Sequence, residues 1–409
     1  MIRLPRPLLA VSLLLASAAP LWAQSTPASQ PAASRPAATS PGALPATFPA
    51  GPTDEQCLEL GGKIEKAMIA GDMIGINLIV NRIQLLDKAA RGLNIPEDSK
   101  WDLLPLLRSS ESIGRGMTSL AKGPGSCKLL RVHRVDGQPC VLLRVVAGAS
   151  GITYLDVEAG YNSEGQVGIT DVHMYMQGQA YSDGVRQAIL TSGASRGRGE
   201  GLTGADKQFV AYLPQIQKMQ LLIGAGKHEQ ALQMSAGLPP ELRNRKPVIF
   251  ARLVCAARIR SPEYVPIATE FAKVYPADPA LGLLSLDNHL ASGQLNEALA
   301  DLDSIDQAIG GDPYLDSVRA SVCLTTGDLP KAKEFATQAI AREPELERAY
   351  VVLLGLSLRE KNFAETARLL TTLETKLHVK LPVLTMNPEY AGFVASDAYT
   401  AWMKSRPRP

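Results

Sequence analysis

The C-terminal half of the chain repeats with a period of 34 residues, and this repeat constrains the fold more than any other feature of the sequence. The same offset separates three pairs of residues: Gly293 and Gly327, Ala298 and Ala332, and Pro279 and Pro313. A period of this length is typical of helical hairpins stacked in a row. The sequence therefore predicts an all-α solenoid in this half.

Each repeated residue has a mechanical role in such a hairpin. Gly293 and Gly327 should end the first helix of a pair, because glycine adopts the left-handed backbone conformation that closes a helix. Ala298 and Ala332 are small enough to let the paired helices approach closely. Pro344 should stop the second helix before the next pair begins.

Weaker copies extend the repeat in both directions. The segment GAGKHEQALQM, residues 224–234, lies two periods upstream, and LREKNFAETARLL, residues 358–370, lies one period downstream. Five units fit between residues 206 and 380, although the second, residues 247–275, is degenerate and Lys361 replaces the glycine of the fifth. Residues 381–409 should supply a capping helix, residues 388–403, and a tail.

The residues Gly327, Leu329, Ala332, Ala339 and Pro344 resemble the consensus of the tetratricopeptide repeat (TPR). This resemblance implies a concave surface that is lined by the first helix of each pair and binds a protein or peptide partner. In the family's register the surface would comprise Leu283, Asp287, Leu290, Tyr314, Ser321, Leu324, Arg348, Leu358 and Arg359. Alternatively, the surface packs on the N-terminal domain or on a second copy of the chain.

The ligand class of one part of the TPR family does not carry over. Chaperone-associated members hold an acidic C-terminus with Lys and Asn side chains, whereas Asp287 and Ser321 occupy such positions here.

The N-terminus has the pattern of a secretory signal peptide, residues 1–23, with Arg3 and Arg6 before an apolar run and small residues before a cut after Ala23. Leu21 is an imperfect residue for such a cut, so an uncleaved anchor is the alternative. Residues 24–52 are almost entirely Ala, Pro, Ser and Thr, which predicts a disordered spacer. We expect an exported protein, periplasmic or extracellular, without a membrane span after signal cleavage.

Charge and cysteine content argue against several classes of function. The chain has 42 basic and 40 acidic residues without a basic stripe, which disfavours nucleic acid as a partner. Its five cysteines form no CxxC pair and are odd in number, so neither a disulfide framework nor a zinc site is indicated. No motif indicates a cofactor, and free, partly buried thiols are expected.

Residues 53–190 predict an α+β domain. Helical patterns at residues 56–70, 74–91 and 103–121 precede strand-like runs at 128–135, 140–146, 153–159 and 167–177. If Asp136 and Gly137 form a two-residue turn, Cys140 faces His133 and Cys127 faces Val146. The order of elements resembles NTF2-like domains, although no strand is visible between the second and third helices where that family has one.

Polar side chains alternate along the last predicted strand. One face should carry Val167, Ile169, Asp171, His173 and Tyr175, and the preceding strand should bring Tyr154, Asp156 and Glu158 together. These groups could form a general acid/base set or a ligand pocket. They could equally form the solvated or hydrogen-bonded face of a sheet.

The segment GEGLTG matches a dinucleotide-binding pattern only formally, because no buried strand precedes it, and residues 191–205 are better interpreted as a Gly/Arg-rich interdomain linker. The sequence as a whole therefore predicts an α+β domain, residues 53–190, followed by a TPR-like solenoid, residues 206–380. We expect a non-catalytic scaffold or adaptor that binds protein. The alternative is an enzyme or small-molecule binder built on the sheet of the first domain.

Overall fold

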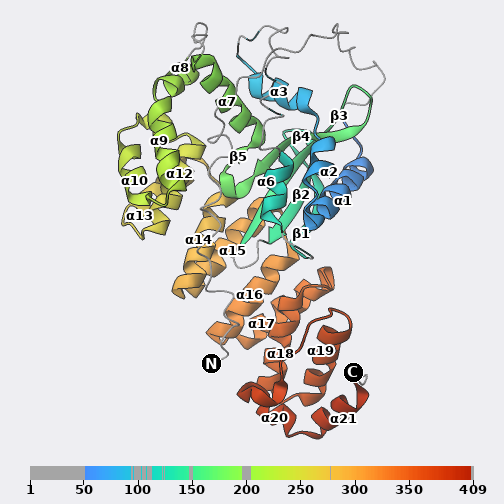
Figure 1. Ribbon diagram of the computed structural model, residues 1–409. Coiled ribbons are helices and arrows are strands. Elements are labelled where there is room, and N and C mark those ends of the chain that lie inside the picture. Colours follow the sequence, from blue (N-terminus) through green and yellow to red (C-terminus); the bar gives the residue numbers. More distant parts are fainter. Residues whose placement is uncertain are drawn as a thin grey trace. The chain divides into compact units, whose positions relative to one another are not determined.

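The computed structural model describes residues 51–93, 113–121, 125–146, 151–195, 204–276 and 278–406, together with Ile95, Leu103, Leu107 and Gly123 (Figure 1). The predicted signal peptide and nearly all of the predicted spacer lie outside the described residues. The chain divides into two compact units, one ending at Leu284 and the other beginning at Ser285, and each is described by itself. The order of elements, an α+β region followed by consecutive helices, confirms the predicted fold class.

The first unit contains a five-stranded antiparallel meander whose strand order follows the sequence. Its strands are β1 (Cys127–Val135), β2 (Gln138–Val146), β3 (Ile152–Tyr161), β4 (Val167–Met174) and β5 (Gln179–Ala180). Its first helices are α1 (Asp54–Ala70), α2 (Met73–Leu78), α3 (Arg82–Ala90), α6 (Ile113–Leu120) and α7 (Tyr181–Ser195). Apolar side chains from helices and strands form one buried core, which includes Ile64, Leu85, Leu143, Leu155 and Val185.

The helix predicted over residues 74–91 is two helices, because the backbone between them joins the sheet. The N–H of Asn81 donates to the carbonyl of Ile169 at 2.8 Å, and the N–H of Ile169 donates to the carbonyl of Ile79 at 2.8 Å. Asn81 then caps α3 by accepting a hydrogen bond from the N–H of Gln84. Of the helix predicted over residues 103–121, the described part is α6 with Leu103 and Leu107.

Two irregularities in the sheet correct the predicted register. His133 pairs with Cys140 as expected, but a shift between Leu129 and Arg131 places Cys127 opposite Val145 rather than Val146.

A second shift lies between Glu158 and Ala159, opposite the segment from Asp171 to Ile169. Val167 and Ile169 therefore pack in the helix-covered core, together with Val172, instead of sharing a face with Asp171. The predicted strand also ends early, at Met174, and Tyr175–Gln177 forms a 3-10 turn.

Helix α7 follows the sheet directly and was not predicted. Its residues Val185 and Ile189 belong to the core of the sheet, and Leu190 belongs to a second core formed with the helices that follow. The predicted linker is thus partly helical: residues 191–195 complete α7, and Gly204 begins the next helix. Residues 196–203 lie outside the described residues.

Helical hairpins complete the first unit. The helices are α8 (Gly204–Ala211), α9 (Leu213–Gly224), α10 (His228–Ala236), α11 (Pro240–Arg243), α12 (Lys246–Arg258) and α13 (Tyr264–Val274). Leu213, Leu253 and Phe271 are buried in their common core. The short helix α11 has no counterpart in the 34-residue repeat, and it directly precedes the degenerate unit, residues 247–275.

Helix α14 (Pro279–Ser292) spans the boundary between the units, and the second unit continues with paired helices. These are α15 (Leu295–Ile309), α16 (Pro313–Thr326), α17 (Leu329–Arg342), α18 (Glu347–Arg359) and α19 (Phe363–Thr375). Gly327 has a φ of 88° and closes α16 as predicted. Pro313 begins the same helix, and α17 ends at Arg342, two residues before Pro344.

The predicted capping helix, residues 388–403, is interrupted. The segment comprises 3-10 turns at Leu384–Met386 and Pro388–Tyr390, then α20 (Ala391–Val394) and α21 (Asp397–Ser405). The break occurs because the Ser396 hydroxyl accepts from the N–H of Tyr399 and caps α21. Phe393 and Trp402 are buried against Leu369 and Leu370 of α19.

No helix in the described part of the chain has the length and hydrophobicity that a membrane crossing requires.

Candidate functional site

The predicted groove residues differ widely in exposure. Leu283, Ser321 and Leu324 are buried, Asp287, Leu290, Tyr314, Arg348 and Leu358 are half-buried, and Arg359 is exposed. Helix α16 is buried at every position from Leu315 to Leu324. The side chains of the predicted groove that reach the surface in the second unit therefore come mainly from the ends of α16 and α18.

The structure brings two of these side chains together. The guanidinium of Arg348 lies over the ring of Tyr314, 5.7 Å from its centroid, and Nη2 donates to the Tyr314 hydroxyl at 3.4 Å. The Nε of Arg348 is buried and has no hydrogen-bond partner among the described residues. Arg359 donates from Nη1 to the carbonyl of Leu324 at 3.1 Å, so its remaining donors are available at the surface.

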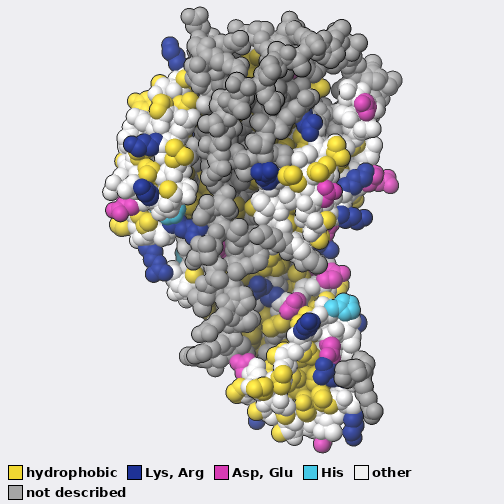
Figure 2. Space-filling view, viewed as in Figure 1, with side chains coloured by type: hydrophobic (Ala, Val, Ile, Leu, Met, Phe, Trp, Pro, Cys, Tyr) yellow, Lys and Arg dark blue, Asp and Glu magenta, His cyan; other side chains and the backbone are white. Residues whose placement is uncertain are grey.

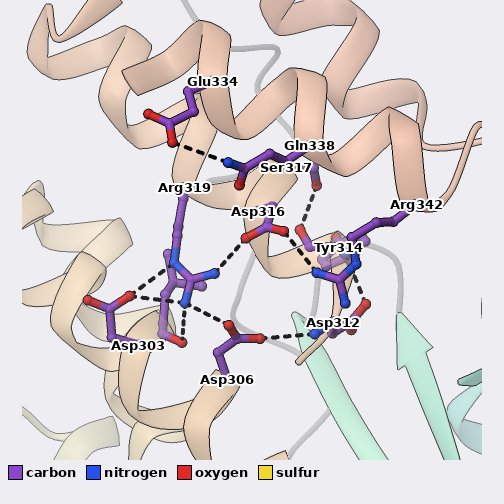
Figure 3. Close-up of polar contacts among 11 residues, drawn as sticks. Asp303, Asp306, Asp312, Tyr314, Asp316, Ser317, Arg319, Glu334, Gln338 and Arg342 are labelled. Carbon is purple, nitrogen blue, oxygen red and sulfur yellow. Dashed lines mark hydrogen bonds and ion pairs between the residues drawn. The ribbon is translucent and has the colours of Figure 1, made fainter. Parts of the chain in front are cut away.

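Next to this surface, the buried Arg319 is the centre of an ionic network that sequence reasoning did not find (Figure 3). Its side chain is 6% exposed and contacts Asp303 at 3.0 Å, Asp306 at 3.3 Å and Asp316 at 2.8 Å. Burial alone would lower the pKa of Arg319, but the three carboxylates outweigh it and raise the pKa above its usual range. Arg342 adds a second cation at 3.3 Å from Asp316.

This network fixes the start of α16 as well as its packing. Asp306 accepts the N–H of Asp312 at 2.9 Å, and Asp312 caps the helix by accepting the N–H of Tyr314 at 2.9 Å. Tyr314 therefore stands on a helix end that is held by a chain of polar contacts. A side chain presented from such a support loses little conformational entropy when a partner binds.

On the sheet, the candidate residues divide into two separate clusters. Asp156 is the acceptor of the first: His133 Nε2 lies 2.6 Å from Oδ1, and the Tyr175 hydroxyl donates to Oδ2 at 2.7 Å. The ring of His173 packs edge-on against Tyr175, with centroids 4.9 Å apart. Tyr154 is fully buried and also contacts Tyr175, edge-on at 6.5 Å.

His133 was the member of this cluster that sequence reasoning missed, and the hairpin register could have found it. Arg131 pairs with Leu142, which pairs with Asp156, so the next residue of β1 on the same face is His133.

Asp171 has a structural role at the beginning of α7. Its carboxylate accepts the hydroxyl of Ser182 at 2.5 Å and the N–H of Ser182 at 3.1 Å, and it also accepts the N–H of Val172 at 2.9 Å. Asp171 and His173 lie on one face of β4, and the hydrogen bonds of Asp171 go to Ser182 and Val172. Burial is the main cause that lowers the pKa of His173, and the charge of Lys246 lowers it further. Together they outweigh Asp278, Asp156 and Asp183, which act in the opposite direction.

The cysteine thiols are poorly suited to nucleophilic chemistry. All five cysteines are free and buried, and burial raises the pKa of Cys127, Cys140 and Cys255 to about 12, which suppresses the reactive thiolate. Within the described ranges, no group of three or more His, Cys, Asp or Glu side chains is arranged to hold a metal ion.

Comparisons with known proteins place the chain in no family: no protein-family model matches it, and no curated protein is significantly similar to it.

Proposed function

We propose that this chain is a non-catalytic interaction protein that binds a protein or peptide partner on its second unit, as a scaffold or adaptor. The observation that carries the proposal is the half-buried pair Tyr314 and Arg348. The guanidinium lies over the aromatic ring, and its buried Nε has no hydrogen-bond partner within the described part of the chain. Tyr and Arg dominate the binding energy of protein interfaces, because they combine large contact area with hydrogen-bond donors. Arg359 lies at the other end of α18 and supplies an exposed cation.

Exposed hydrophobic surface on the same unit supports the same function. Figure 2 shows hydrophobic side chains gathered on the visible face where Figure 1 places α18, α19 and α20. Exposed apolar side chains of this unit include Val351, Val383, Met386 and Met403. Interface cores are enriched in apolar side chains together with Tyr and Arg.

The 34-residue spacing of the helix pairs supports assigning the helical part to TPR-like repeats, and the meander under helices supports an NTF2-like first domain. The apolar N-terminus followed by small residues supports export through a signal peptide, to the periplasm or the extracellular space. These assignments are part of the proposal and are independent of the binding test below.

The test compares three proteins in a pull-down from the exported fraction of the producing cells, quantified by mass spectrometry. One variant carries Tyr314→Ala, Arg348→Ala and Arg359→Ala. The control carries Lys331→Ala and Lys333→Ala, which are exposed on α17 with side chains 64% and 62% accessible. Circular dichroism and thermal unfolding check that all three proteins are folded.

Proteins captured by the wild type and the control should be lost from the triple variant by at least about tenfold, since interface Tyr and Arg side chains are each worth about 2 kcal/mol or more. Equal capture by all three proteins would show that this surface is not the binding site. A fourth protein with Asp156→Asn and His133→Gln tests the sheet, and loss of capture in this variant alone would assign the binding site to the sheet.

A further inference from the structure

The first unit contains a cavity of about 370 Å³ that none of the sequence motifs indicated. Its walls come from α7, α8, α9 and α12, with β5 at one side and Tyr275 after α13. In Figure 1 these helices run from green to yellow. The volume lies in the range of pockets that hold small organic ligands.

One wall of the cavity is apolar. It is formed by side chains that belong to the core of the helical hairpins: Leu190, Phe209, Ile216, Met219 and Val248. These side chains are nearly inaccessible to solvent, so they offer a dry surface to the apolar part of a ligand.

Three cations, Arg186, Arg245 and Lys246, also line the cavity, and Arg186 and Lys246 are already paired with other groups. Arg186 donates to the carbonyls of Ala89 and Arg91 at 3.1 and 2.7 Å and to Asp206 at 2.7 Å. Lys246 is paired with Asp278 at 2.5 Å.

The guanidinium of Arg245 has N–H donors that can bind a ligand. Its guanidinium lies over the ring of Phe209, 5.3 Å from the centroid, and its nearest carboxylate among the described residues is Asp206, at 4.0 Å. This separation is too long for a hydrogen bond. A guanidinium has five N–H donors in a planar fork that matches a carboxylate.

Two acceptors in the same cavity also lack partners. Oε1 of Gln179 and Oε1 of Gln220 are buried and accept no hydrogen bond from the described residues, and both side chains line the cavity. A buried acceptor without a donor is costly, so a bound molecule that donates an N–H or O–H here would remove that cost.

We propose that this cavity binds a small amphipathic carboxylate that carries an amide N–H, the chemistry shared by N-acyl amino acids and peptide C-termini. The carboxylate pairs with Arg245, the N–H donates to Gln179 or Gln220, and the apolar side chain lies on Phe209 and Met219. This site is separate from the surface of Tyr314 and Arg348 and does not depend on it.

The probes are N-acetyl-L-leucine and N-acetyl-L-phenylalanine, titrated into the full chain by isothermal calorimetry. Their C-terminal amides serve as matched neutral probes, and a tetrapeptide ending in leucine distinguishes the two sources of the ligand. The acids should bind at least about tenfold more tightly than the amides, because a hydrogen bond to a charged group is worth more than about 1.4 kcal/mol. Equal binding of acid and amide, or no binding of either, would overturn the proposal.

Two variants test the position of the site. Arg245→Gln removes the charge and should weaken binding of the acids to the level of the amides. Ala251→Leu fills the cavity without changing its charge and should abolish binding of acids and amides alike. It remains informative if Arg245→Gln does not fold.

Lys218→Gln is the control, because Lys218 is exposed on α9, two residues from Gln220. Its affinity for every probe should equal that of the wild type. Unchanged affinity in both Arg245→Gln and Ala251→Leu would place the ligand elsewhere. A tetrapeptide that binds as tightly as N-acetyl-L-leucine identifies a peptide C-terminus as the ligand, and a tetrapeptide that is excluded identifies a free small molecule.

Discussion

The two units build their interiors from different materials. In the first unit, here called the sheet unit, the core against the sheet buries large side chains such as Met68, Leu143 and Ile169. In the second, the helical unit, half of the residues buried between α16, α17 and α18 are alanines, including Ala332 and Ala336. Buried charge differs as well. In the sheet, the Asp156 carboxylate is satisfied by two ring-bearing side chains, while in the helical unit the Arg319 guanidinium is surrounded by three carboxylates.

This difference follows from the geometry of the elements. Side chains stand out from a sheet and must be large to fill the space up to the covering helices, about 10 Å away. Helices that pack through alanine approach more closely, and their remaining polar groups must then find partners inside a narrow space. The helical unit should therefore be the more sensitive to an added methyl group or a removed charge.

The largest effect should come from Arg319→Met. The substitution keeps much of the volume but leaves Asp303, Asp306 and Asp316 close together without their common cation, which should lower the free energy of unfolding by about 3 kcal/mol. Chemical denaturation measures the change. The control is Arg368→Met, whose ion pair with Glu365 is exposed and should contribute less than about 1 kcal/mol. Equal effects of the two substitutions would show that the Arg319 network stabilises the fold no more than an exposed ion pair does.

An intermediate effect is expected from Ala332→Leu. Ala332 is fully buried between the paired helices, so the larger side chain should force α16 and α17 apart at a cost of about 1–3 kcal/mol. Ala300→Leu is the matched control because Ala300 is exposed on α15. Differential scanning calorimetry should show a lower Tm for the first variant only. An equal Tm for the Ala332→Leu and Ala300→Leu variants would show that Ala332 is not tightly packed between α16 and α17.

The smallest effect concerns His173 and the pH dependence of the sheet unit. Burial lowers the folded-state pKa of His173 below its ordinary value of 6.5, so the unfolded chain binds the proton more readily. Stability is then fully present above pH 6.5 and is lost as the pH falls through the lowered pKa. His173→Gln should flatten this part of the stability profile. The pKa of the half-buried His228 is also lowered, chiefly by desolvation, so some slope should remain. A steeper dependence of stability on pH in the variant would contradict a lowered pKa of His173.

The sequence was most informative where a period or a turn could be counted. Gly327 and Pro313 end and begin α16 as their spacing predicted, and the turn at Asp136 and Gly137 set His133 opposite Cys140. Both cases depend only on local backbone chemistry, which is written in a few adjacent residues.

The failures involve contacts between residues that are far apart in the chain. The register shift at Glu158 and Ala159 has no local signature, yet it reverses the face on which Val167 and Ile169 lie. The sequence did not predict the cavity either, because its residues are far apart in the chain. Its key groups, Gln179, Gln220 and Arg245, come from three segments with no common motif.

Helix α7 gives the first unit a property that neither of its cores would have alone. Val185 and Ile189 are part of the sheet core, while Leu190, the next residue, is part of the core of α8–α13. Unfolding of either core therefore removes packing from one side of the same helix and weakens the other. The two cores should behave as a single cooperative foldon, and a fragment that stops within α7 would not inherit the stability of the sheet. The first unit thus contains a sheet and helical hairpins along the chain, but we expect it to unfold in a single cooperative transition.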